Sequence, residues 1–504
     1  MKKLLPLLGC LLLLFAACKK EDSGPQLTPG AVPLTRVLIN GMPAQADESG
    51  SIYTVLLPGQ TDFTSMRIRL LTDAPIIQLN GNTVGKSIPE VDMSQPCSLR
   101  LIQNGTYQDY RLIARNTGLP IVHIDTPNKK KIDSKEYWME GAAVRIEYPN
   151  GRVDYEGTTS IRGRGNSTWL WYPKKPYALK LDEKGSLLGM PAHKRWVLLA
   201  NWKDRTLMRN DAAFWLSRQT GLSYTVRGHH VELVLNGTHV GNYYLCEQIK
   251  IGKHRVNVEK MDSQESDPTR ITGGYLLEID TYLDEKYQFK SPRFNLPWMV
   301  KEPEDDELSA AAFNYIKSWI LELESLLKDT QRVRNHEYEA YLDVDSAIDY
   351  MLVEELTTNH DFYNEWPWPG PHSAYLYKDR DGKLFHGPVW DFDYHVFCPQ
   401  FTHQWTGATR TMLYPALLKD PQFCDRMVER WEMQKEQLKR LPEYIDAQAE
   451  KIRLSDQVNQ ELWPISNREN GDETMSFQQS IDRIKKSFLD KWTWMDAHIR
   501  ELGR

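Results

Sequence analysis

Cysteine is scarce in this chain, which has six cysteines in 504 residues. Two of them fall in the first eighteen residues, and the others are Cys97, Cys246, Cys398 and Cys424. Four cysteines spread over the rest of a long chain do not form the dense disulfide framework of a small secreted domain. There is no C-x-x-C pair, which excludes a zinc ribbon. We expect the four to be small buried hydrophobic residues.

An excess of one sign of charge is also missing. The 62 lysines and arginines nearly balance the 68 aspartates and glutamates, for a formal net charge of −6. Composition therefore gives no reason to expect a nucleic-acid partner or an acidic solvating tail. With 41% hydrophobic and 26% charged residues, the chain is not disordered, collagenous or a coiled coil. Its length suggests about three domains.

Two well-known catalytic motifs are absent as well. The chain has neither the G-x-S-x-G turn of many hydrolases nor the H-E-x-x-H pattern of zinc proteases. Four histidines, namely His360, His372, His386 and His395, lie near two aspartate motifs. Because they lack a ligand spacing, a transition-metal site there is only an alternative.

The chain begins with an apolar run, Leu4 to Phe15, between two lysines and Ala16-Ala17-Cys18. It is too short to span a membrane and is typical of a secretory signal. Its end resembles the lipobox of bacterial lipoproteins, which implies removal of residues 1–17 and lipidation of Cys18; an ordinary signal-peptidase site is the alternative. We therefore expect a protein held at the bacterial outer membrane, on its periplasmic or surface face, by a lipid anchor alone.

Composition shifts divide the rest of the chain into three parts. Residues 18–35 are polar with several prolines and glycines, which predicts a tether. Residues 36–116 predict a small Ig-like β-sandwich, because short apolar runs alternate with Asn-Gly turns. Residues 117–504 predict an α+β domain of two lobes with a cleft between them.

Periodicity predicts the elements of these parts. In the sandwich we expect strands at 37–39, 52–57, 66–71, 76–79, 99–102 and 110–114. In the larger domain we expect strands at 144–148, 177–181, 231–235, 243–247 and 275–279, and a hairpin of 374–378 with 384–389. Helices are expected at 204–219, 307–328 and 345–358, and over most of 410–504.

A basic, glycine-rich stretch is the first candidate for chemistry. Between Gly157 and Leu181 there are five basic residues and no acid, which suits a phosphate: Arg162, Arg164, Lys174, Lys175 and Lys180. The stretch is not a P-loop, and a twisted hairpin with solvated arginines is the alternative. Lys180 lies in an apolar strand similar to the V-A-I-K strand of protein kinases, unless it is an edge-strand lysine that faces water.

Aspartates after apolar segments are the second candidate. Asn359-His360-Asp361 follows an apolar helix, and Trp390-Asp391-Phe392-Asp393 follows a predicted strand. Carboxylates are the ligands that Mg²⁺ prefers. Phosphoryl transfer needs one acid beside the attacking hydroxyl and another to hold the metal against the phosphates. Aspartates that only cap turns are the alternative.

Taken together, these segments resemble the CotH family, the spore coat protein H-like kinases. The matching blocks occur in family order: Arg164-Gly-Asn-Ser-Thr-Trp169, Pro173-Lys-Lys-Pro-Tyr177, Leu188-Gly-Met-Pro191, Trp196-Val-Leu-Leu-Ala-Asn201, Leu207-Met-Arg-Asn210, Gly273-Gly-Tyr-Leu-Leu-Glu-Ile-Asp280, Asn359-His-Asp361 and Gly387-Pro-Val-Trp-Asp-Phe-Asp393. The resemblance implies an atypical protein kinase-like fold over about residues 120–500. It also implies transfer of phosphate from ATP, with Mg²⁺ or Mn²⁺, to serine or threonine hydroxyls of an exported protein or peptide.

The resemblance also implies roles for single residues. Asp361 would be the catalytic acid and Asp391 the metal-binding acid, while Arg164 and Lys180 would face the nucleotide phosphates. Asp393 and Asn359 would be partners of the metal or of its ligands. Residues 394–397 and the aromatic loop Trp366–Trp368 depart from the family pattern. A surface binding or adhesion module with this fold and little or no catalysis is the alternative.

Overall fold

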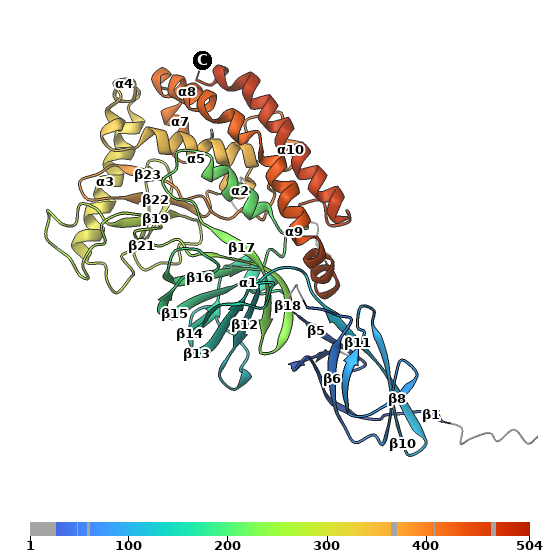
Figure 1. The fold of residues 1–504 in the computed structure, drawn as a ribbon. Coiled ribbons are helices and arrows are strands. Elements are labelled where there is room, and N and C mark those ends of the chain that lie inside the picture. Colours follow the sequence, from blue (N-terminus) through green and yellow to red (C-terminus); the bar gives the residue numbers. More distant parts are fainter. Residues whose placement is uncertain are drawn as a thin grey trace, which may run out of the picture. The chain divides into compact units, whose positions relative to one another are not determined.

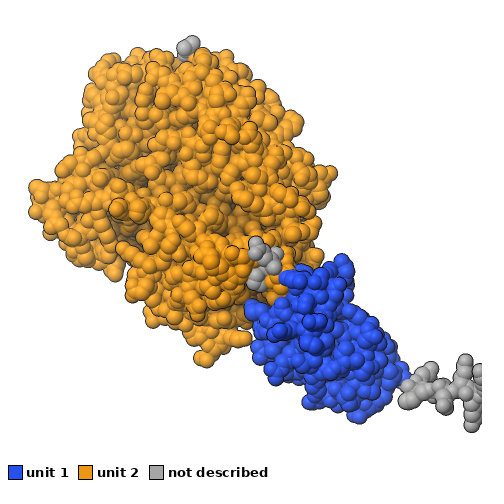
Figure 2. Space-filling model, in the orientation of Figure 1, with its two compact units in different colours: residues 1–55, 62–114 blue, residues 56–61, 115–504 orange. Residues whose placement is uncertain are grey.

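A computed structural model describes residues 27–47, 49–57, 61–363, 370–407, 409–464 and 470–503. The chain forms two compact units, residues 1–55 with 62–114 and residues 56–61 with 115–504 (Figure 2). Strands dominate its first half and helices its last part, so the fold is mixed α and β (Figure 1). The predicted signal, Cys18 and the Trp366–Trp368 loop lie outside the described residues.

The first unit contains two β-sheets. One has the strand order β3-β2-β6-β9 and the other β4-β5-β11-β10-β7-β8, with β1 paired to β11. Their bounds are β1 Thr28–Pro29, β2 Leu34–Ile39, β3 Met42–Pro43, β4 Gln45–Ala46, β5 Ile52–Leu56, β6 Met66–Thr72, β7 Ile76–Leu79, β8 Asn82–Val84, β9 Ser87–Val91, β10 Cys97–Gln103 and β11 Thr106–Arg115. Every predicted strand range falls on one of them, because their apolar residues alternate with polar ones. The first strands begin inside the segment expected to be a tether.

The second unit opens with a closed barrel in the order β12-β13-β14-β15-β16-β18-β17. The strands are β12 Ile121–Asp125, β13 Met139–Glu147, β14 Val153–Gly163, β15 Tyr177–Gly185, β16 His193–Leu199, β17 Gly228–Leu235 and β18 Thr238–Glu247. Ile161, Leu179, Trp196 and Leu245 belong to one buried cluster of barrel residues. Apolar side chains thus fill the barrel, which leaves its outer face for a site.

A second sheet, in the order β20-β21-β19-β22-β23, follows the barrel. Its strands are β19 Tyr275–Ile279, β20 Gln288–Lys290, β21 Pro297–Glu302, β22 Ala374–Lys378 and β23 Leu384–His386. The predicted strand 275–279 is β19, and the predicted hairpin is β22 with a shorter β23. Sequence periodicity did not reveal the barrel closure, because it depends on pairing between distant segments.

Helices make up most of the rest of the unit (Figure 1). The helices are η1 Pro127–Lys129, α1 Ser167–Trp171, α2 Arg209–Arg218, α3 Ala310–Lys328, α4 Thr330–Arg334, η2 Glu337–Ala340, α5 Val344–Thr357, α6 His360–Tyr363, η3 Pro399–Phe401, α7 Tyr414–Leu417, α8 Pro421–Leu438, α9 Leu441–Leu462, α10 Phe477–His498 and η4 Ile499–Glu501. None of the helices in the described ranges is long and apolar enough to cross a membrane.

Two predictions about local structure had different outcomes. The helix expected at 204–219 begins only at Arg209, because the Asp204 carboxylate accepts the backbone N–H groups of Thr206 and Arg209 and forms a turn before it. The four remaining cysteines are buried and free, as predicted, and all of them are described.

Candidate functional site

One cleft, with a volume of about 1060 Å³, lies in the second unit. Arg162, Ala178 and Val197 line it from cross-strand paired positions on β14, β15 and β16. Asp280 and Asp391 line it from the ends of the second sheet's strands. The cleft is therefore bounded by the outer face of the barrel and by the second sheet with its following segments.

Three of the predicted aspartates meet in this cleft. Asp361 lies on the short helix α6, and Asp391 and Asp393 lie in the segment after β23; all three are lining residues. Asp391 has a left-handed backbone with φ +68°, a conformation that aspartate adopts more readily than most residues. The fold thus gathers acids that are far apart in the sequence.

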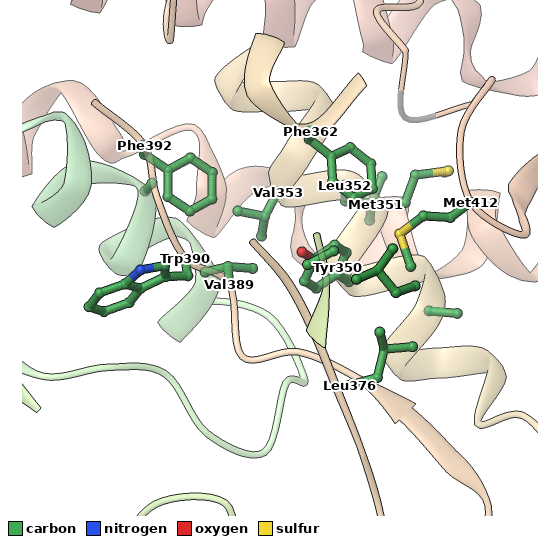
Figure 3. Close-up of a cluster of buried hydrophobic side chains, with 14 of the residues drawn as sticks. Tyr350, Met351, Leu352, Val353, Phe362, Leu376, Val389, Trp390, Phe392 and Met412 are labelled. Atoms are coloured by element: carbon green, nitrogen blue, oxygen red, sulfur yellow. The ribbon is translucent and has the colours of Figure 1, made fainter. Parts of the chain in front are cut away.

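Buried aromatic neighbours hold these acids in place. Phe362 directly follows Asp361 and is 1% exposed, and Phe392 directly follows Asp391 and is fully buried. Both belong to one cluster of buried hydrophobic side chains (Figure 3). The Phe392 N–H also donates to the Asn210 side chain on α2 at 2.8 Å. Packing on one side of each acid leaves its carboxylate on the cleft side.

A fourth aspartate, Asp280, shares the cleft. It follows β19 directly and is 6% exposed. Its carboxylate accepts the N–H of Tyr282 at 2.8 Å and the N–H of Ser373 at 2.9 Å. The His372 ring nitrogen lies 3.4 Å from the same carboxylate. Backbone N–H groups from two segments therefore anchor Asp280.

The cations of the cleft fall into two groups. Arg195 and Lys250 pair with Glu304 at 2.9 and 2.8 Å, and Lys301 pairs with Glu278 at 3.1 Å. By contrast, no carboxylate of the described residues lies within ion-pair distance of the other cleft cations Arg162, Arg164, Lys135 and Lys203. Cations without a carboxylate partner are the ones available to an anionic ligand.

Lys203 is the unpaired cation that faces the acids. Its ammonium lies 4.0 Å from the ring centre of Tyr394 and 5.4 Å from that of Tyr172, so two aromatic rings hold it in the cleft. Its positive charge counteracts the rise in the pKa of both Asp361 and Asp393. Lys203 therefore stands opposite these two carboxylates.

The carboxylates of the cleft repel one another. Burial, and then repulsion from Asp391, raises the pKa of Asp361 to about 7. The same two causes raise the pKa of Asp393 to about 7. A raised pKa makes Asp361 a stronger base than an ordinary aspartate. The negative charge gathered here also favours a bound cation.

Two predicted residues lie elsewhere. Lys180 is exposed and does not line the cleft. It lies opposite Arg195 in the register of β15 and β16, so both side chains are on the same side of the barrel wall. Asn359 is 3% exposed, and its amide donates to Glu354 at 2.9 Å rather than lining the cleft. The structure thus brings together Arg164, Asp361, Asp391 and Asp393, but not these two.

The acids fit a divalent metal that is bound together with phosphate. In the described parts of the chain, no three His, Cys, Asp or Glu side chains already form a metal cluster. Mg²⁺, however, is commonly held by one or two carboxylates together with substrate phosphates and water. The mutual repulsion of Asp361, Asp391 and Asp393 is what such a cation would relieve.

Three residues of the site escaped the sequence analysis: Lys203, Asp280 and Ser373. Asp280 ends a block that was recognised, and its place after an apolar strand was the signal that could have identified it. Lys203 lies between two recognised blocks in a turn, where a single lysine carries no pattern. Ser373 has no sequence signal, because its role depends on contacts with two other segments.

Comparison with known protein families gives a match over most of the part of the chain that forms the cleft. A family model described as CotH kinase protein matches residues 161–495, a range that includes the cleft residues Asp280, Asp361, Asp391, Asp393 and Lys203. No curated protein matches the chain.

Proposed function

Because the chain belongs to the CotH kinase protein family, we propose that it is an atypical protein kinase that transfers the γ-phosphoryl group of ATP to serine or threonine hydroxyls of an exported or surface protein. In this proposal the barrel forms one lobe of a kinase-like domain and the helical part forms the other. One observation carries it: cations with no carboxylate partner among the described residues and closely spaced carboxylates line a single cleft.

The unpaired cations suit the nucleotide. Arg162 and Arg164 lie on and just after β14, and Lys203 lies after β16, so all three can approach a polyphosphate from the barrel side. Their positive charge stabilises the charge on the transferring phosphoryl group. Lys203, beside two aromatic rings, is the cation whose charge acts on both Asp361 and Asp393.

The acids have two separate roles in this proposal, proton acceptance and metal binding. Asp361 takes the proton of the acceptor hydroxyl as its oxygen bonds to the γ-phosphorus and the bond to the β–γ bridging oxygen breaks, which releases ADP. Asp391, with Asp393, would hold Mg²⁺ or Mn²⁺, and such an ion supplies charge neutralisation and orientation of the phosphates. Asp361 is a suitable acceptor because its pKa of about 7 lies near physiological pH.

The first residues of the chain, which the structure does not describe, support the proposed location. We propose that Cys18 carries the lipid and that the protein acts at the bacterial envelope. Its acceptor is then a protein or peptide that reaches the same compartment.

The test is transfer of ³²P from ATP to an acceptor protein by the purified full chain. Wild type should label the acceptor only with Mg²⁺ or Mn²⁺ present. In Asp361→Asn and in Asp391→Asn the rate of phosphate transfer should fall about 100-fold or more. Lys180→Met is the matched control, because it removes a charge outside the cleft.

The adhesion alternative gives a different result. A chain that binds no ATP with Mg²⁺ in calorimetry, and whose Asp361 and Asp391 variants behave as wild type in every assay, would be a binding module with a kinase-like fold.

A further inference from the structure

Ser373 connects two of the cleft's aspartates. The antiparallel pairing of Ile279 with Ala374 places Ser373 opposite Asp280, where β19 ends and β22 begins. The Ser373 N–H donates to Asp280 at 2.9 Å. Its hydroxyl donates to Asp391 at 3.3 Å. One residue therefore contacts both the anchored acid and the acid assigned to the metal.

The backbone at this contact is unusual on both sides. Ser373 has φ +52° and Asp391 has φ +68°, both in the left-handed region. Non-glycine residues rarely adopt it, and they persist there when the surroundings fix them. For Ser373 the surroundings are the sheet register and the bond to Asp280. The direction of its Cα–Cβ bond is thus set by the fold.

Asp280 is suited to be the fixed end of this chain of contacts. It is buried, and a second backbone N–H, that of Tyr282, holds its other carboxylate oxygen. Asp391 has fewer restraints, because the only hydrogen bond that the described residues make to its side chain is the one from Ser373. A carboxylate in a loop otherwise turns freely about its terminal torsion.

We infer that Ser373 is a positioning residue that orients the Asp391 carboxylate for the metal–nucleotide complex, with Asp280 as its anchor. This inference rests on the proposed function, since that proposal assigns the metal to Asp391. Loss of the hydroxyl should weaken metal binding in the presence of nucleotide and leave metal-free nucleotide binding unchanged.

The left-handed backbone decides which variant tests the inference. Ser373→Gly adopts positive φ without strain and keeps the N–H to Asp280, so it removes the CH2OH side chain and leaves the backbone contact in place. Ser373→Asn is the matched rescue, because asparagine tolerates this conformation and its amide is a donor. Alanine and threonine are poorer choices, because both are strained at φ +52°.

The affinity of the full chain for Mn²⁺ in the presence of a non-hydrolysable ATP analogue measures this weakening. The loss of the EPR signal of free Mn²⁺ reports the binding. Ser373→Gly should bind Mn²⁺ about fivefold more weakly than wild type, the expected loss for a hydrogen bond to a charged group at long distance. Ser373→Asn should regain most of that affinity. In EDTA, the two variants and wild type should bind the analogue equally.

Wild-type Mn²⁺ affinity in Ser373→Gly, or equal weakening in Ser373→Gly and Ser373→Asn, would overturn the inference and leave the proposed function standing. Weaker binding of the analogue in EDTA would overturn it too, because the effect would then not concern the metal. If wild type itself binds no Mn²⁺ with the analogue, the proposed function fails and the inference with it.

Discussion

At the scale of single residues, charge pairing separates structural from functional side chains in the cleft. Arg195, Lys250 and Lys301 are neutralised by glutamates, so their charges serve the protein itself. Lys203 is held by aromatic rings, which fix its position without neutralising it. A cation kept in place but not neutralised is suited to an anionic substrate.

Replacing Lys203 should therefore affect catalysis more than replacing Lys180. Lys203→Met keeps the aliphatic stem between the rings and removes the charge, and we expect kcat/KM for ATP to fall about 100-fold. Lys180→Met should change it less than about threefold, because an exposed charge is screened by water and salt. Similar losses in the two variants in steady-state kinetics would restore Lys180 as a phosphate ligand.

His386 is expected to make stability depend on pH. It is 1% exposed, neither ring nitrogen has a partner among the described residues, and burial lowers its pKa to about 3. Between pH 6.5 and 3 the unfolded chain binds a proton at this ring that the folded chain does not, so the contribution of His386 to stability falls as pH falls through that window.

His386→Phe should remove this contribution, which is about 2 kcal/mol at pH 5 relative to pH 7. Urea unfolding at several pH values between 7 and 4.5 measures it. If the variant loses as much stability as wild type on acidification, another group controls the pH dependence.

At the scale of elements, the ends of strands and helices place the acids. Asp280 follows β19, and Asp391 follows β23 by a short segment. Helix α5 ends at Thr357, and Thr358 has φ +52°, which turns the chain toward α6 and Asp361. Glu355, in the last turn of α5, forms an ion pair with Lys491 of α10, and both side chains are fully buried.

Breaking that pair should destabilise the helical part strongly. Lys491→Met leaves the Glu355 carboxylate buried without a cation, and we expect a loss of about 3–5 kcal/mol in the free energy of unfolding, measured with urea. Adding Glu355→Gln should recover much of the lost stability. In the wild type the Thr406 hydroxyl donates to Glu355 at 2.7 Å, and the glutamine amide oxygen can still accept this hydrogen bond. A double variant as unstable as Lys491→Met would show that packing, not charge, causes the loss.

At the scale of the whole molecule, the chain has two units, each with buried apolar residues of its own. The cleft belongs to the second unit alone. The two units should therefore unfold as separate cooperative blocks.

Calorimetry of the full chain should show two transitions. Leu112→Ala, at a fully buried position in β11, should lower the transition temperature of the first unit, with a loss of about 2–5 kcal/mol in its free energy of unfolding. Leu352→Ala, fully buried in α5, should lower the transition temperature of the second unit. A single transition that shifts with both variants would mean that the units unfold together.

The sequence by itself determined the elements and much of the site's chemistry. Alternating apolar residues determined the strands of the first unit, the 275–279 strand was predicted at its observed bounds, and ordered motifs indicated the family and Asp361, Asp391 and Asp393. These features are local: each depends on residues that are neighbours along the chain.

Only the tertiary structure decided the barrel closure, the entry of Lys203 and Asp280 into the cleft, and the exclusion of Lys180 and Asn359 from its lining. It also decided the contact of Ser373 with Asp391. The physical reason is the same in each case. Which groups face one another, and which cations stay unpaired, depends on the pairing of distant strands and on burial, and neither is encoded in the spacing of a motif.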